Sequence, residues 1–208
     1  MRIGILGGTF DPPHKGHLHM ALCAQDSLGL DQILFVPCSR QPLKREFPAA
    51  SGFHRAAMVA MAISRRESWL LEPIELDQGG LSYTIETLST LVQRFAGRDL
   101  YHLIIGQDSF ASFPRWRRFE EILSIAKIVV IPRDPVIPEP LTPAIPADRV
   151  ERISARPVKV SSTAIRERLS LGHSISGLVP RAVESYILKQ GLYREGIHRE
   201  PIGGDRDG

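Results

Sequence analysis

The 208-residue sequence contains only two cysteines, Cys23 and Cys38, and no apolar run long enough to span a bilayer. Two cysteines cannot build the disulfide framework of a small secreted protein, and we expect both to be reduced because one falls on an expected helix and the other ends an expected strand. The apolar N-terminus breaks at Gly7 and Gly8 before it reaches the length of a signal peptide. These absences predict a cytoplasmic protein with no membrane partner.

A strong charge of either sign is also lacking. The chain has 26 Lys and Arg against 23 Asp and Glu, a formal net charge of +3, and charged residues make up 24% of it. This mild basic excess suits small ligands that carry phosphate, and it does not require a nucleic-acid partner, so none is expected. With 43% hydrophobic residues, the length allows one α/β domain with a full core.

Short apolar runs alternate with segments of helical periodicity along the chain. The expected strands cover residues 3–6, 31–37, 69–72, 100–105 and 127–132. The expected helices cover about residues 17–28, a segment capped by Ser51, residues 85–95 and a segment after Trp116. This alternation predicts an α/β fold, a Rossmann-like doubly wound parallel sheet.

The C-terminal third reads differently. Prolines spread over residues 135–146 exclude regular helix and central strand there. A short strand is expected at 158–160, followed by helices that start at Ser161 and near Pro180. We therefore expect one domain over residues 1–193, with a small C-terminal helical region at about 161–193 and a flexible tail at 194–208.

The first loop, GGTFDPPHKGH at residues 7–17, carries the most chemistry. It is neither a Walker A loop nor a Gly-x-Gly-x-x-Gly loop. His14 and His17 stand at the start of a helix, whose free N–H groups attract anions, so two imidazoles there could bind phosphate oxygens. A zinc pair and two surface histidines are the alternatives. Since no cluster of Cys, Asp or Glu stands at zinc spacing, the phosphate interpretation is favoured and no protein metal site is expected.

Two motifs together carry a resemblance. The loop at 7–17 resembles the signature of the nucleotidyltransferase superfamily with the His-x-Gly-His motif, and VSSTAIR at 160–166 resembles its second motif. Within that superfamily, SYTIETL at 82–88, IGQDS at 105–109 and Trp116 are similar to the bacterial nicotinate-nucleotide adenylyltransferases. The resemblance runs from Arg2 to about Tyr193.

The resemblance implies a reaction and its partners. In such enzymes AMP passes from ATP to nicotinate mononucleotide, which gives deamido-NAD and pyrophosphate in NAD biosynthesis. The acceptor phosphate attacks the α-phosphorus of ATP in line, without a covalent enzyme intermediate. Mg²⁺ is the implied cofactor, bound mainly through the ATP phosphates, and ATP and nicotinate mononucleotide are the implied partners. Formation of a homo-oligomer is left open.

The resemblance also implies roles for residues on the ATP side. The residues implied to act in catalysis are His14, His17 and Arg166. Those implied to bind ATP are Gly7, Gly8, Thr9, Phe10, Lys44, Ser161, Ser162 and Thr163. Glycine allows the backbone to approach the phosphates, and a helix N-terminus with a guanidinium can hold the departing pyrophosphate.

On the mononucleotide side the implied residues are Thr84, Asp108, Trp116 and Arg133. Trp116 offers a flat surface for a pyridine ring, Asp108 an acceptor for a ribose hydroxyl, Thr84 a backbone N–H for the nicotinate carboxylate, and Arg133 a charge for the phosphate. On residue type alone, a core tryptophan, a capping aspartate and a solvated arginine are equally ordinary.

The chain departs from the pattern of these enzymes at Leu43, where histidine is common, and at Gln78 and Leu81, where arginine and proline are usual. The departures affect the loop near Lys44 and the entry to the mononucleotide pocket. Two alternatives stay open. One is a sister transferase for nicotinamide mononucleotide or phosphopantetheine, and the other is a non-catalytic nucleotide-binding protein of the same fold.

Overall fold

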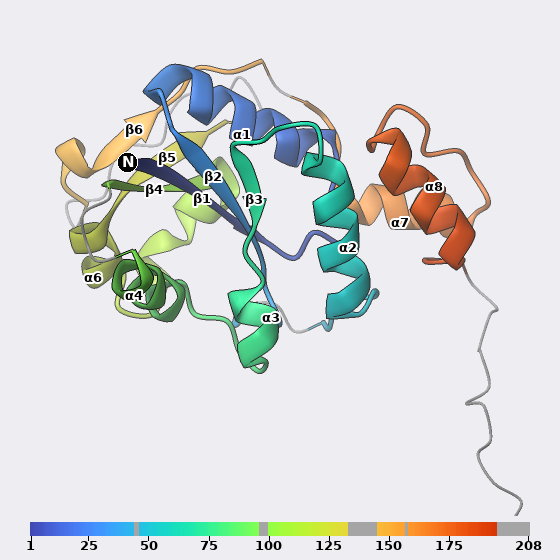
Figure 1. The fold of residues 1–208 in the computed structure, drawn as a ribbon, viewed down its shortest axis with the longest axis horizontal. Helices are drawn as coiled ribbons and strands as arrows, with labels where there is room; N and C mark the ends of the chain where they lie inside the picture. The colour runs from blue at the N-terminus through green and yellow to red at the C-terminus, as the bar shows by residue number, and fades with distance from the viewer. Residues whose placement is uncertain (44–45, 96–99, 133–144, 157, 195–208) are drawn as a thin grey trace, which may run out of the picture.

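The computed structural model describes residues 1–43, 46–95, 100–132, 145–156 and 158–194 (Figure 1). Its centre is an all-parallel sheet in the order β3-β2-β1-β4-β5-β6. The strands are β1 (Arg2–Gly8), β2 (Gln32–Pro37), β3 (Trp69–Leu71), β4 (Leu100–Gly106), β5 (Ala126–Ile131) and β6 (Val150–Arg152). The predicted Rossmann-like doubly wound sheet is confirmed. Because the strand order reverses between β1 and β4, ligands are expected at the carboxyl ends of these two strands.

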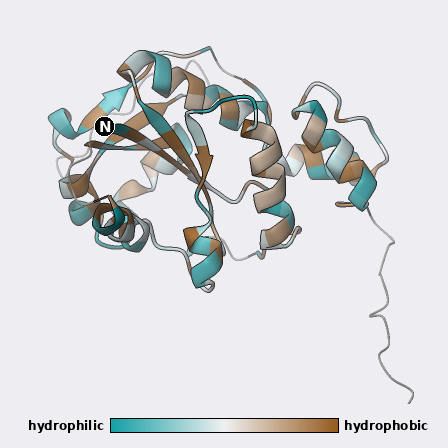
Figure 2. Ribbon diagram, in the orientation of Figure 1, coloured by the Kyte–Doolittle hydropathy of each residue, from teal (hydrophilic) through white to brown (hydrophobic). Residues whose placement is uncertain are grey.

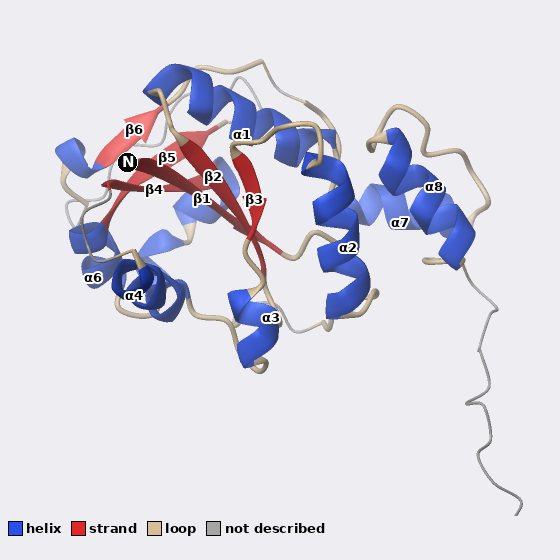
Figure 3. Ribbon diagram, in the orientation of Figure 1, coloured by secondary structure: helices blue, strands red, loops and turns tan. Residues whose placement is uncertain are grey.

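Helices cover both faces of the sheet (Figure 3). One core cluster joins β-strand side chains to α1 (Lys15–Leu28) and α2 (Gly52–Ile63). The other joins the opposite face to α4 (Thr84–Arg94), α5 (Gln107–Ala111) and α6 (Phe119–Ile125). Figure 2 shows the strands between these layers as largely hydrophobic, as expected of parallel strands that are buried on both faces. In the described part of the chain, no helix has the length and apolar character needed to cross a membrane.

The C-terminal helices α7 (Ser162–Ser170) and α8 (Arg181–Gln190) lie beside α2, away from the sheet (Figure 1). A third apolar cluster joins them to α2, with Met58, Ile165 and Val183 fully buried at its centre. The Tyr186 hydroxyl and His54 Nδ1 also share a hydrogen bond of 2.8 Å between α8 and α2. Helix α2 therefore holds the C-terminal helices against the rest of the molecule.

The structure corrects the sequence-based expectations in several places. The strand expected at 158–160 is wrong, because the free edge of β5 pairs instead with β6, in the register Ile128 to Val150. Helix α1 begins at Lys15, two residues earlier than expected. The short helix α3 (Ile74–Gln78) was not expected. The proline-rich segment at 135–146 lies almost wholly outside the described residues, as does the tail after Arg194.

Glu75 of α3 is a buried carboxyl group, 8% exposed. It accepts a hydrogen bond of 2.6 Å from the Thr87 hydroxyl of α4. The nearby Ser82 hydroxyl accepts the Ser39 backbone N–H at 2.9 Å. Burial raises the pKa of Glu75, and the Thr87 and Ser82 hydroxyls oppose that rise. Glu75 and Ser82 thus tie α3, the start of α4 and the segment after β2 together.

Replacement of Ile165 tests how the C-terminal helices are held. We expect Ile165→Ala to lower the free energy of unfolding by about 2–5 kcal/mol, because it leaves a cavity in the third cluster. The control is Leu171→Ala, which removes a side chain that is 70% exposed just after α7 and should cost less than about 0.5 kcal/mol. Urea unfolding measures both, and equal losses would contradict this packing.

Replacement of Glu75 tests its burial. The folded-state pKa lies above the ordinary value of 4.5, so the folded protein binds the proton more tightly than the unfolded chain does. Wild type should therefore lose stability relative to Glu75→Gln as the pH rises through the raised pKa, since glutamine still accepts from Thr87 and carries no charge. Thermal unfolding from about pH 4 to 8 measures the trend. Glu120→Gln removes an exposed charge as the control. If the stability difference between wild type and Glu75→Gln did not change with pH, the raised pKa of Glu75 would be refuted.

Candidate active site

The loop between β1 and α1 lies at the carboxyl edge of the sheet, where the strand order reverses. Phe10 turns under this loop with φ of 50° and is only 1% exposed. A Cβ atom at Gly8 would lie 3.3 Å from the Phe10 ring, so glycine lets the main chain pass directly over the buried ring. The Phe10 ring lies beneath the loop, so the loop backbone lies at the surface, and Gly7 is exposed there.

His14 and His17 lie one above the other at the start of α1. Their rings stack with centroids 3.7 Å apart, and Phe10 packs edge-on against His17 at 4.9 Å. His14 is the N-cap residue and is buried, and its backbone N–H donates to His17 Nδ1 at 3.2 Å. This bond requires an unprotonated Nδ1, so the neutral His17 ring carries its proton on Nε2 and can donate it to an acceptor.

Gly16 makes room for this arrangement. A Cβ atom there would stand 3.0 Å from the His14 ring and 3.1 Å from Val160, just before α7. The glycine between the two histidines therefore allows the second motif to approach the first.

Helix α7 is fastened to the first loop by side chains that reach back across it. The Ser162 hydroxyl donates to the Pro12 carbonyl, and Arg166 donates to the Asp11 carbonyl, both at 2.9 Å. Ser161 caps α7 by accepting the Ala164 N–H at 3.2 Å, and the Thr163 side chain is exposed. The two motifs, about 150 residues apart in sequence, thus form one site.

Below the loop lies Arg55 of α2, which the sequence did not single out. It is 2% exposed and donates to the backbone carbonyls of Thr9 at 2.8 Å, Cys38 at 2.6 Å and Ala50 at 3.2 Å. No sequence signal marked it, because an arginine near the start of an amphipathic helix usually faces solvent. Its guanidinium joins the first loop to the segments after β2 and before α2.

Asp108 and Trp116 follow β4 on the same edge of the sheet. Asp108 is exposed in the first turn of α5. Trp116 is half-buried, and its ring packs on the fully buried Phe113 with centroids 5.3 Å apart. The indole is therefore anchored on one side by the core while part of it stays accessible, which a stacking surface requires.

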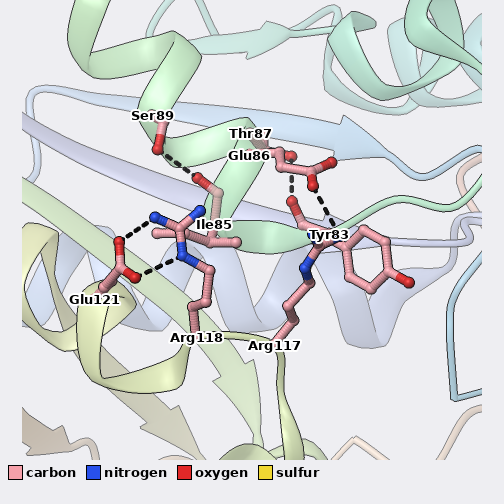
Figure 4. Close-up of polar contacts among 8 residues, drawn as sticks. All are labelled: Tyr83, Ile85, Glu86, Thr87, Ser89, Arg117, Arg118 and Glu121. Carbon is pink, nitrogen blue, oxygen red and sulfur yellow. Dashed lines mark hydrogen bonds and ion pairs between the residues drawn. The ribbon is translucent and has the colours of Figure 1, made fainter.

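Thr84 is the first residue of α4, and the turn before it is well fixed. Ser82 N–H donates to the Arg40 carbonyl at 2.9 Å, which ties this turn to the segment after β2. The Arg117 guanidinium lies over the Tyr83 ring at 4.5 Å and pairs with Glu86 at 3.1 Å (Figure 4). Thr84 N–H is one of the first donors of the helix, which have no partner within the helix itself.

The structure thus brings His14, His17, Ser161, Ser162 and Arg166 together, and places Thr84, Asp108 and Trp116 at the same edge of the sheet. Lys44 and Arg133, expected to bind ATP and the mononucleotide, lie outside the described residues. Among the described residues, no group of three or more His, Cys, Asp or Glu side chains is placed to hold a metal ion.

Comparisons with known proteins show which family the chain belongs to. The cytidylyltransferase-like family model matches residues 5–168. A protein of Gemmatimonas aurantiaca, named a probable nicotinate-nucleotide adenylyltransferase, is 41% identical over 199 residues, which are 94% of this chain and 93% of that protein. The nicotinate-nucleotide adenylyltransferase of Bacillus subtilis is 38% identical over 192 residues, 92% of this chain and 98% of that one.

A solved structure shares the fold. The Plasmodium falciparum nicotinic acid mononucleotide adenylyltransferase, complexed with NaAD, matches with a TM-score of 0.73 at 20% identity, over 92% of this chain and 97% of that chain. At this identity the match concerns the fold alone. With the family model and the relatives above, it follows that the chain belongs to the cytidylyltransferase-like family and, within it, to the nicotinate-nucleotide adenylyltransferases.

Proposed function

We infer that the protein is a nicotinate-nucleotide adenylyltransferase of NAD biosynthesis, which transfers AMP from ATP to nicotinate mononucleotide and releases pyrophosphate. The observation that supports this most strongly is the meeting of the two motifs, where Arg166 of α7 reaches the carbonyl of Asp11 beside the two stacked histidines. A binding protein without chemistry has no need of imidazoles, a helix N-terminus and a guanidinium around one phosphate site.

For the transfer step we propose in-line attack of the mononucleotide phosphate on the α-phosphorus of ATP. Negative charge on the α-phosphoryl oxygens is stabilised by His17, whose neutral ring carries its proton on Nε2, and by His14 beside it. Arg166 uses one of its donors on Asp11, and a guanidinium has further donors for the leaving group. These groups are held before ATP arrives, so they need little reorganisation in the transition state.

The ATP phosphates are proposed to lie along the backbone of Gly7, Gly8, Thr9 and Phe10. On α7 the Ser161 hydroxyl caps the helix and the Ser162 hydroxyl donates to Pro12. The backbone N–H groups of Ser162 and Thr163, at the positive end of the helix, are then the donors proposed for the departing pyrophosphate. Lys44 is proposed to add a positive charge from its loop.

The mononucleotide is proposed to lie on the β4 side of the site. Trp116, supported by Phe113, would stack on the pyridine ring, and Asp108 would accept from a ribose hydroxyl. Thr84 N–H at the start of α4 would donate to the nicotinate carboxylate, and Arg133 is proposed for the mononucleotide phosphate.

Mg²⁺ is proposed to arrive with ATP. The carboxylate nearest the histidines in sequence, Asp11, is buried and already accepts the N–H groups of Ala49 and Ala50, so it does not fit a metal ligand. Mg²⁺ commonly binds through substrate phosphates and retained waters, which suits such a site. When bound, it would neutralise phosphate charge that the histidines and Arg166 also face.

The activity is tested by pyrophosphate release from ATP with nicotinate mononucleotide, nicotinamide mononucleotide or phosphopantetheine as the acceptor. We expect the acid to be preferred over the amide by at least about tenfold in kcat/KM, because the amide cannot take the place of a carboxylate held by N–H donors. A ratio near one would refute the substrate choice. Binding of both ligands without turnover by the wild-type protein would favour the non-catalytic alternative.

Replacement of His17 tests its role in the transition state. We expect His17→Ala to lower kcat on the order of 10²-fold, with a much smaller effect on KM, because the ring acts on charge that develops during transfer. The control is His19→Ala on the same helix, whose ring bonds the Arg156 carbonyl at 2.8 Å outside the two motifs and whose loss should leave kcat within about twofold. Steady-state kinetics measures both, and an unchanged kcat in His17→Ala would rule out the role.

A further inference from the structure

The C-terminal end of the described chain reaches the centre of the first loop. The Tyr193 hydroxyl donates to Asp11 Oδ1 at 2.7 Å, although the two residues are 182 positions apart. Tyr193 has a φ of 65°, a left-handed conformation that costs energy for a bulky side chain and persists where the surroundings hold it. Leu192 and Tyr193 also pack against the third apolar cluster. The tyrosine is therefore held from the ring side and presents its hydroxyl to the loop.

Asp11 is the point where several segments meet. Its carboxylate is 3% exposed and accepts the Ala49 N–H at 2.7 Å and the Ala50 N–H at 3.1 Å, in addition to Tyr193. Its own carbonyl accepts from Arg166. A buried carboxylate that loses one donor is left partly unsatisfied and moves to find another. Asp11 lies three residues before His14, whose backbone N–H orients His17. We therefore expect a displacement of Asp11 to move the rings of both histidines.

The Tyr193 hydroxyl is a lasting donor. Burial, and next the Asp11 carboxylate, raise the pKa of Tyr193 above its ordinary value of 10.0, while Arg166 and Arg55 oppose that rise. The phenol therefore stays protonated and continues to donate throughout the pH range in which the protein is folded and assayed.

We propose that Tyr193 is a positioning residue for the transfer reaction, which sets the first loop and its two histidines through Asp11. The proposal rests on the proposed function, and it gives the C-terminal helices a role beyond that of α7. The chain that follows α8 carries Tyr193, so the first loop is correctly placed only when the C-terminal helices are packed against α2.

The chain contains a matched control. Tyr186 of α8 also shares one hydrogen bond, with His54 of α2, and packs against the same apolar cluster. Tyr186→Phe and Tyr193→Phe each remove one hydroxyl from the C-terminal helical region without opening a cavity. The described contacts of Tyr186 join α8 to α2 and to the third apolar cluster, away from the first loop, so its loss tests stability alone.

We expect Tyr193→Phe to lower kcat about tenfold and to raise KM for ATP several-fold, with KM for the mononucleotide within about twofold of wild type. Tyr186→Phe should keep all three constants within about twofold although it also loses a hydrogen bond and some thermal stability. Wild-type kinetics in Tyr193→Phe would overturn the proposal. So would equal kinetic losses in the two variants, because both would then reflect general loosening.

A double mutant adds a second readout. If Tyr193 acts through the loop histidines, the about tenfold loss caused by Tyr193→Phe should shrink to less than about threefold in a His17→Ala background. The same tenfold loss in both backgrounds would show that the two residues act independently, and would count against a role in positioning.

The two proposals fail in different ways. No pyrophosphate from the wild-type protein with any of the acceptors would refute the proposed function. In that case ATP affinity, measured by calorimetry on the wild-type protein and both tyrosine variants, still tests Tyr193. A weaker affinity in Tyr193→Phe alone supports its placement of the loop, and equal affinities in all three proteins refute it.

Discussion

The site depends on two buried side chains of opposite charge, Asp11 and Arg55, both of which form hydrogen bonds with backbone groups. The Asp11 carboxylate accepts N–H groups of residues 49 and 50, and the Arg55 guanidinium donates to carbonyls of Thr9, Cys38 and Ala50. An isolated charge would not be tolerated at this depth, because its desolvation costs several kcal/mol. Here each charge satisfies main-chain groups that would otherwise be buried without partners, so the loops around it have little freedom.

This constraint suits the first loop to the phosphate-binding role proposed for it. Backbone groups stabilise a developing charge well only when they are held in place beforehand. Phe10 supports the loop from below, Asp11 and Arg55 hold its main chain, and the stacked rings of His14 and His17 stand at its end. The free energy that keeps the loop ordered comes from packing elsewhere. Apolar clusters hold α2 against the sheet and the C-terminal helices against α2.

The side of the site proposed for the mononucleotide is held by side-chain hydrogen bonds of another kind. The bonds from Thr87 to Glu75 and from Ser39 N–H to Ser82 fix the start of α4 relative to α3 and the segment after β2. Two departures from the usual residues of these enzymes fall close to it. Gln78 ends α3, and Leu81 is exposed and bridges to Arg40. Both are compatible with the observed turn, since the hydrogen bonds that hold it come from Ser82 and from backbone groups.

The amino-acid sequence by itself determined the fold class and the residues of the two motifs. Alternating apolar runs and helical periods predict a parallel sheet covered on both faces, and the two motifs together predict a phosphate site at its edge. Local patterns sufficed here because each of these elements buries a face that its own residues define. The same local reasoning misplaced the last strand at 158–160, because which segment pairs with β5 depends on where the chain returns to the sheet.

Only the tertiary structure decided what supports the site. Nothing local distinguishes Arg55 from a solvent-exposed helix arginine, or Tyr193 from an ordinary residue after a helix. Their partners in the first loop, Thr9 and Asp11, lie 46 and 182 positions away in sequence. The same holds for Ser161 and Ser162, which the sequence marks only as the start of a helix, whereas the structure shows that their hydroxyls bond the Ala164 N–H and the Pro12 carbonyl. Pattern and propensity describe what a segment can form, whereas long-range hydrogen bonds to a buried charge exist only once the chain has folded around it.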